Sequence, residues 1–171
     1  MRTSVSKKLR YAAYGSNLHP RRLRERIEHA KLVGTSFLKQ HTLQFHKRGQ
    51  DESAKCSFSS CGQGMHVAVY EVNESGKQVL DRIEGVGKGY DVASLHVPGI
   101  GECFTYIAAR THIDDFLQPF DWYREMVLLG CHSHAFPGAY CDSIAAVPTI
   151  ADPDEDRRKK NWGIVELLRQ R

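Results

Sequence analysis

The sequence predicts an α+β domain in which a small sheet or barrel is surrounded by helices, and three observations lead to this class. Residues 65–72 are apolar and β-branched enough to form a central strand. Residues 98–101 (Pro-Gly-Ile-Gly) separate two strand-like segments and predict a hairpin. Around residues 122–129, apolar side chains recur at helical spacing. A strand-rich core followed by a helical C-terminal third is typical of an α+β fold.

Length and composition are those of one globular domain. The chain has 171 residues, of which 41% are hydrophobic and 26% charged, so disorder as the main state is excluded. No apolar run approaches the ~18 residues of a membrane helix, and no apolar segment follows the basic residues 1–10 as it would in a signal peptide. The five cysteines are odd in number and irregularly spaced, which favours reduced thiols in the cytoplasm over a disulfide framework.

The first part of the chain is predicted to contain four strands and one helix. Residues 8–14 predict a strand that ends on a Gly-Ser-Asn turn. Pro20 suits the first turn of a helix, which the apolar pair Leu23 and Ile27 extends to about His29. The remaining strands are predicted at residues 32–38, 42–46 and 55–59, with polar loops between them.

The middle of the chain predicts a short helix and then the hairpin. In residues 74–84 the apolar side chains fall at helical spacing, and the glycine-rich run 85–89 ends the helix. The hairpin strands are predicted at residues 90–97 and 102–108.

The C-terminal third is predicted to be helical. Helices are expected at residues 121–131 and 138–146, followed by a charged, proline-containing linker at 152–160 and a last short amphipathic helix. Residues 1–150 are therefore expected to form the domain, with residues 151–171 as a linker and a helix that packs on the same domain.

Two basic clusters, residues 21–26 and 157–160, contribute much of the net charge of +4. Glu25 lies within the first cluster, as expected of a solvated helix face, so neither a nucleic-acid nor a membrane partner is predicted. The segment Cys131-His132-Ser133-His134 matches no zinc-ligand spacing, so no metal is predicted.

The segment Tyr14-Gly15-Ser16-Asn17 lies where the first strand leads into a helix. Backbone N–H groups in such a turn favour negative charge and suit a substrate carboxylate or a developing oxyanion. Gly15 allows a ligand to approach the backbone without meeting a Cβ. Taken alone, Gly-Ser-Asn is common turn chemistry, and an ordinary turn is then the simpler interpretation.

Glu84 is the second candidate for chemistry. It lies on the last turn of its predicted helix, where the helix dipole disfavours a carboxylate. Burial at that place would raise its pKa, as general-base catalysis near neutral pH requires. The alternative is an exposed acid paired with Arg82 or Lys88, and without further context that interpretation is the stronger one.

Three blocks of sequence point to a known family. Residues 11–18 (YAAYGSNL) form the first block, residues 69–72 and 80–90 (VYEV, LDRIEGVGKGY) the second, and residues 122–130 with 136–140 (WYREMVLLG, FPGAY) the third. Together they resemble the γ-glutamylcyclotransferase family, also called AIG2-like. The chain departs from the usual family pattern at Ala12, where an aromatic residue is common, and at residues 131–134.

The resemblance implies a small, mostly antiparallel β-barrel with peripheral helices and no metal or organic cofactor. It implies intramolecular aminolysis of a γ-glutamyl amide, a reaction of glutathione metabolism that yields 5-oxoproline and a free amine or amino acid. Glu84 matches the catalytic acid/base of the family. The residues matching the substrate pocket are Tyr14, Gly15, Ser16 and Asn17 in the cradling loop, and Tyr90, Tyr106 and Tyr123 as walls and hydroxyl donors.

Other functions remain open at this point. The substrate can be a different γ-glutamyl amide, such as a γ-glutamylamine or a γ-glutamyl group on a biosynthetic intermediate. The same pocket can also serve a non-catalytic module that binds a small metabolite, although such a binder needs no acid beside the loop. A small barrel that binds nucleic acid is supported only by the arginine cluster. The leaving group, the oligomeric state and the pathway are not determined by the sequence.

Overall fold

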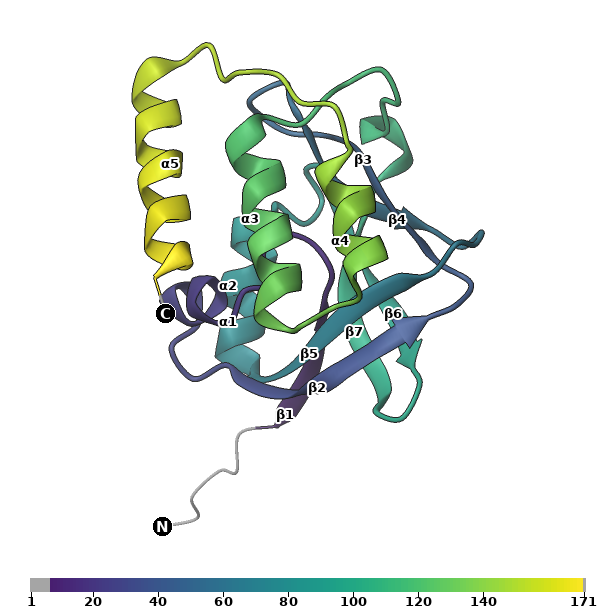
Figure 1. The fold of residues 1–171 in the computed structure, drawn as a ribbon. Coiled ribbons are helices and arrows are strands. Elements are labelled where there is room, and N and C mark those ends of the chain that lie inside the picture. The colour runs from purple at the N-terminus through teal and green to yellow at the C-terminus, as the bar shows by residue number, and fades with distance from the viewer. Residues whose placement is uncertain (1–6, 171) are drawn as a thin grey trace.

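Seven strands and five α-helices make up the part of the protein that the computed structural model describes, residues 7–170 (Figure 1). In chain order they are β1 (Lys8–Ala13), α1 (Pro20–Arg26), β2 (Lys31–Leu38), β3 (Thr42–Arg48), β4 (Ala54–Ser59), β5 (Met65–Asn73), α2 (Glu74–Glu84), β6 (Tyr90–Val97), β7 (Gly101–Ala108), α3 (Asp121–Ser133), α4 (Gly138–Ala145) and α5 (Glu155–Arg169). A 3₁₀ turn at Arg110–His112 follows β7. The α+β class predicted from the sequence is confirmed.

The strands form two sheets. The larger sheet has the order β2-β5-β1-β7-β6, and all of its pairs are antiparallel except β1 with β7, which is parallel. Strands β3 and β4 form a separate antiparallel pair. Between β4 and β7 the contact includes a side-chain hydrogen bond, from the N–H of Ala108 to Oγ of Ser57. Because no backbone ladder joins the two sheets within residues 7–170, the strands do not form the closed barrel that was expected.

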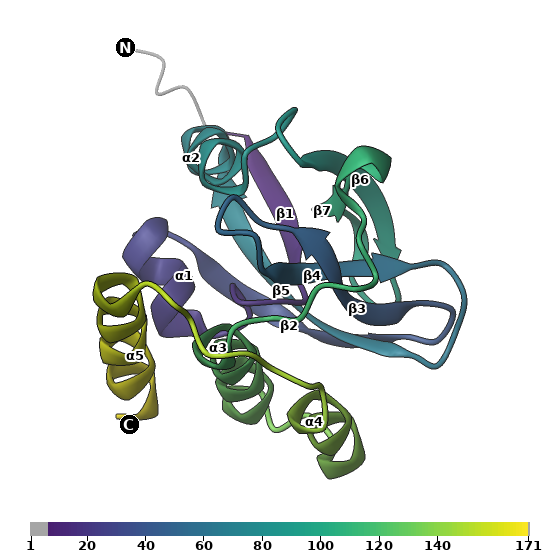
Figure 2. The same cartoon turned by 90° about the horizontal axis from the view of Figure 1, so that it is seen from above.

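The helices cover the sheet from two sides. Helices α3, α4 and α5 lie together on one side of the molecule, whereas α2 lies on the other side, against β1 and β5 (Figure 2). Helix α3 packs on both α4 and α5 and buries Met126, Val127 and Cys131. None of the helices within residues 7–170 is long and apolar enough to cross a membrane.

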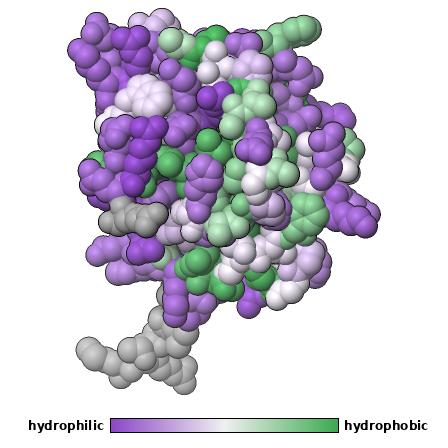
Figure 3. Space-filling view, in the orientation of Figure 1, coloured by the Kyte–Doolittle hydropathy of each residue, from purple (hydrophilic) through white to green (hydrophobic). Residues whose placement is uncertain are grey.

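The predicted linker at residues 152–160 is wrong from Glu155 onward, because these residues begin the long helix α5. Asp154 caps this helix by accepting a hydrogen bond from the N–H of Arg157 at 2.9 Å, and Glu155 pairs with Lys159 one turn later at 3.0 Å. The charges that suggested a linker are thus a capped helix start with a hydrophilic surface (Figure 3). On its other side, α5 buries Val165 and Leu168.

Asp152 ties the start of α5 to α3. Its side chain is fully buried and accepts hydrogen bonds from Nε1 of Trp122 at 3.0 Å and from Nε and Nη2 of Arg157 at 2.8 and 2.6 Å. The hydrogen bonds from Arg157 are the largest cause that lowers the pKa of Asp152 from its ordinary value of 3.8 to about 2.

Asp152→Asn should lower the free energy of unfolding by about 2 kcal/mol at pH 7, because the buried amide no longer balances the Arg157 charge. A depressed pKa stabilises the fold above 3.8, and this contribution disappears as the pH falls towards 2. The difference between wild type and variant should therefore shrink between pH 4 and pH 2. Urea unfolding across this range measures it, and a difference that does not change with pH would contradict the role of Asp152.

Candidate active site

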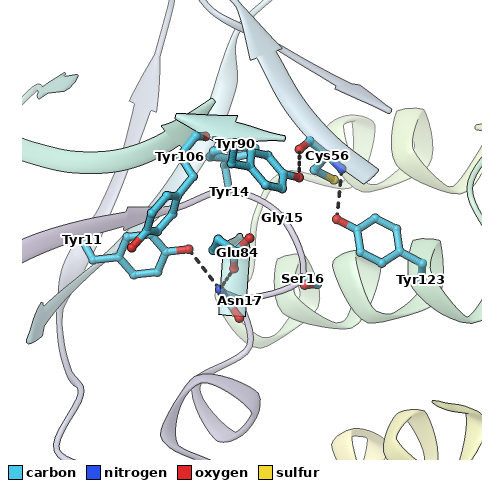
Figure 4. A pocket seen from close by; sticks show the side chains of 10 residues that line it. All are labelled: Tyr11, Tyr14, Gly15, Ser16, Asn17, Cys56, Glu84, Tyr90, Tyr106 and Tyr123. Atoms are coloured by element: carbon cyan, nitrogen blue, oxygen red, sulfur yellow. Dashed lines mark hydrogen bonds between the residues drawn. The ribbon is translucent and has the colours of Figure 1, made fainter. Parts of the chain in front are cut away.

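A small pocket lies where the loop after β1 meets the end of α2 (Figure 4). We call it the inner pocket. It encloses about 30 Å³, room for roughly two water-sized groups. Its lining residues are Tyr11, Tyr14, Gly15, Ser16, Asn17, Cys56, Glu84, Tyr90, Tyr106 and Tyr123. The structure thus brings together all eight residues that the sequence singled out, and adds Tyr11 and Cys56.

The loop between β1 and α1 is held from both sides. A turn closes it, with the N–H of Leu18 donating to the carbonyl of Gly15 at 3.1 Å. On one side, Gly15 lies so close to β4 that a Cβ there would come within 3.0 Å of the Cβ of Cys56. On the other side, Nε2 of His134 lies 2.7 Å from the carbonyl of Leu18. The atypical segment 131–134 therefore supports the back of the loop and does not line the inner pocket.

Glu84 is brought to the pocket by the end of its helix. Gly85 adopts a left-handed conformation with φ of 70°, which ends α2 directly after Glu84. The Glu84 side chain is 18% exposed, and its Oε1 accepts a hydrogen bond from Nδ2 of Asn17 at 2.9 Å. Within residues 7–170 it forms no ion pair with Arg82 or Lys88, so the surface ion pair considered from the sequence is contradicted.

The charge state of Glu84 is set by opposing effects. Burial raises its pKa above the ordinary value of 4.5. The positive charge of Arg26, whose Nη1 lies 3.9 Å from Oε1, and the hydrogen bond from Asn17 oppose this rise. A carboxyl group with a raised pKa and a specific cationic neighbour is typical of acid–base catalysis.

Asn17 connects three parts of the site. Besides Glu84, its Nδ2 contacts the hydroxyl of Tyr11 at 3.1 Å, and its Oδ1 accepts a hydrogen bond from Nη1 of Arg26 at 3.1 Å. Because Arg26 can only donate, it fixes the orientation of the amide. With only 3% of its surface exposed, Asn17 holds the Glu84 carboxylate in one position.

The tyrosine hydroxyls divide into two groups. Tyr90 donates to the carbonyl of Cys56 at 2.6 Å, Tyr106 donates to Oδ1 of Asp81 at 2.7 Å, and Tyr14 donates to the carbonyl of Tyr106. These three O–H groups already donate to acceptors within the protein. Tyr90 and Tyr106 therefore serve as walls of the pocket here, not as the donors that were expected.

The hydroxyl of Tyr123 accepts the N–H of Cys56 at 3.0 Å, and that of Tyr11 faces Nδ2 of Asn17. Both hydroxyl oxygens act as acceptors, and the O–H of Tyr11 can donate to a ligand. The O–H of Tyr123 also interacts with the Cys56 side chain and must turn from it to donate to a ligand. Tyr123 is one of the hydroxyl donors expected from the sequence, and its role towards a substrate stays a prediction. Tyr11 belongs to the same first block but carries no separate signal, because only the pairing of β1 with β5 and β7 directs it to the pocket.

Burial keeps the other titratable groups of the pocket neutral. It raises the pKa values of its five tyrosines far above the ordinary 10 and that of the Cys56 thiol to about 12. A protonated thiol is a poor nucleophile. Glu84 is therefore the group in the inner pocket that can exchange a proton near neutral pH. Within residues 7–170, no three His, Cys, Asp or Glu side chains converge on a possible metal site.

The fold is similar to that of a solved γ-glutamyl cyclotransferase, with a TM-score of 0.82 and 21% sequence identity over 94% of this chain and 99% of the other. An uncharacterized protein from Homo sapiens has a TM-score of 0.77 and 21% identity over 93% and 98% of the two chains. YkqA from Bacillus subtilis has a TM-score of 0.69 and 18% identity, covering 84% of this chain and 56% of YkqA.

No protein-family model and no curated protein sequence matches the chain. At these identities the similarity defines the fold, which is that of the γ-glutamyl cyclotransferase. Apart from the closed barrel, this is the fold that the resemblance of the three sequence blocks implied.

Proposed function

We propose that this protein is an enzyme of the γ-glutamylcyclotransferase type that converts a γ-glutamyl amide into 5-oxoproline and a free amine or amino acid. The observation that carries the proposal is the largely buried Glu84 carboxyl, which Asn17 holds against the loop 14–17 and whose pKa is raised. A site that only binds a ligand has no need of an acid whose pKa is raised by burial, because burying a carboxylate costs free energy.

Glu84 acts first as a base and then as an acid. Its carboxylate takes a proton from the substrate α-ammonium, and the freed amine attacks the γ-carbonyl carbon to close a five-membered ring. Glu84 then returns this proton to the nitrogen of the leaving amine, and the carbon–nitrogen bond to that amine breaks. The ring nitrogen, which still carries a second proton after the attack, gives it to the Glu84 carboxylate, which passes it on to the released amine, so that 5-oxoproline with a neutral ring nitrogen and an ammonium ion result. Proton transfers of this kind contribute about 10²- to 10⁴-fold, and holding the amine next to the carbonyl contributes further.

The loop supplies hydrogen-bond donors for the negative charge of the substrate. The N–H groups of Gly15, Ser16 and Asn17 make no hydrogen bond with any residue in the range 7–170. In the proposed mechanism they hold the α-carboxylate or the oxyanion that forms on the γ-carbonyl, together with the O–H of Tyr123.

A panel of γ-glutamyl dipeptides and γ-glutamylamines tests the proposal. The purified protein should release 5-oxoproline from at least one member, without added metal or cofactor, and chromatography of the products measures it. Binding of γ-glutamyl compounds without any 5-oxoproline would favour the alternative, a module that senses a small metabolite. The cytoplasmic location and the independence from a cofactor stay predictions.

A further inference from the structure

A larger cleft opens beside the inner pocket. We call it the basic cleft. It encloses about 420 Å³ and shares Ser16, Glu84, Tyr90 and Tyr123 with the inner pocket. Two carboxylates line it, those of Asp51 and Glu84, against six cationic side chains: Arg22, Arg26, Lys47, Lys55, Arg82 and Lys88. A group attached to a substrate at Glu84 therefore extends into a strongly positive space.

Arg22 is the first cation of the cleft that lacks a protein partner. It lies on α1, is only 9% exposed, and forms no ion pair within residues 7–170, where its buried Nε also has no hydrogen-bond partner. Burial lowers its pKa to about 10, so it still carries its charge at neutral pH. The prediction that the arginines of residues 21–26 form a solvated face is thus wrong for Arg22, because this part of α1 packs towards the site.

Lys47 is the second such cation. It lies on β3, is 6% exposed, and has its Nζ 4.4 Å from the centre of the Tyr90 ring. No carboxylate of residues 7–170 forms an ion pair with it. Lys55, in contrast, is neutralised by Asp51 at 2.7 Å. Two buried positive charges, from two different elements, thus line one cleft, and neither forms an ion pair with a carboxylate among residues 7–170.

Buried charges without a partner are costly, and such groups are normally paired. Building on the proposed function, we propose that the basic cleft binds the leaving half of the substrate, and that this half is an amine with two negative charges, as in an acidic amino acid. A neutral or cationic amine would leave both Arg22 and Lys47 unpaired. An amino acid with one carboxylate would leave one of them unpaired.

γ-Glutamyl-glutamate and γ-glutamyl-glutamine test this proposal, because their leaving groups differ in charge and hardly in shape. The wild type should show a kcat/KM about 10-fold or more higher for γ-glutamyl-glutamate, which corresponds to one charge-assisted hydrogen bond. Arg22→Met and Lys47→Met should each reduce this preference several-fold, mainly through KM. Arg24→Met removes the same charge from an exposed position of α1 and should keep the preference. Equal kcat/KM values for both dipeptides in the wild type would overturn the proposal.

The alternative is that Arg22 acts only by lowering the pKa of Glu84, and this alternative predicts a different result. Arg22→Met would then shift the pH profile equally for both dipeptides and keep the preference, which would also overturn the proposal. Thermal melting measures whether each variant is folded. If Arg22→Met does not fold, the substrate preference of Lys47→Met decides the test.

Calorimetric binding of both dipeptides to Glu84→Gln separates this proposal from the proposed function. Tighter binding of γ-glutamyl-glutamate supports the cleft even if the wild type releases no 5-oxoproline, and equal binding overturns it.

Discussion

Replacing Glu84 by Gln should reduce the release of 5-oxoproline at saturating substrate by at least about 100-fold at neutral pH. Gln has nearly the same shape, and its side-chain oxygen can still accept the hydrogen bond that Asn17 donates to Glu84 at 2.9 Å. The pocket should therefore persist and bind its ligand. Gln cannot accept a proton at neutral pH, however, so the substrate α-ammonium stays protonated and cannot attack the γ-carbonyl.

The pH profile of the wild type provides an independent check. Glu84 must be ionised to act as the base, and burial raises its pKa above 4.5. The rate should therefore decline on the acid side with an apparent pKa higher than that of a free Glu. Turnover should be measured alongside thermal melting, so that loss of the base is separated from loss of the fold. A folded Glu84→Gln variant with wild-type turnover would contradict the proposed mechanism.

Asn17→Asp should have the second largest effect. The new carboxylate would stand where Nδ2 of Asn17 now lies, 2.9 Å from Oε1 of Glu84. Two carboxylates at such a distance do not readily ionise together, and Arg26 can neutralise only one of them. The acid limb of the rate profile should move up by about one pKa unit or more, since the base then loses its proton only at higher pH. Turnover on the acid side of the profile should fall by up to about 10-fold for a shift of one unit and recover towards pH 9.

Asn17→Ala is the matched control. It removes the same hydrogen bond to Glu84 without adding a charge, so its acid limb should shift less than that of Asn17→Asp. Initial rates of 5-oxoproline release between pH 5 and pH 9 measure both profiles. If the two variants give the same profile, then Asn17 does not act through the ionisation of Glu84.

The sequence predicts an element correctly where the residues that determine it lie within the element or next to it. The helix α2 follows from apolar side chains at helical spacing, and its end follows from Gly85, which tolerates the left-handed conformation. The hairpin of β6 and β7 follows from the glycines at 99 and 101, both with positive φ. Local signals misled at α5, because a run of charges around Pro153 is compatible with a linker and with a capped helix start alike.

The sequence by itself determined the α+β class, the loop 14–17 and the position of Glu84 at the end of a helix, since each depends on turn chemistry and periodicity within a few residues. Only the tertiary structure decided that the sheets stay open, that Tyr11 and Cys56 join the site, and that Arg22 is turned inward. These properties depend on which distant segments pack together. The sequence pattern predicts a solvated charge for Arg22, but the residues packed around it exclude water. The raised pKa of Glu84 has the same cause, which is burial by distant segments.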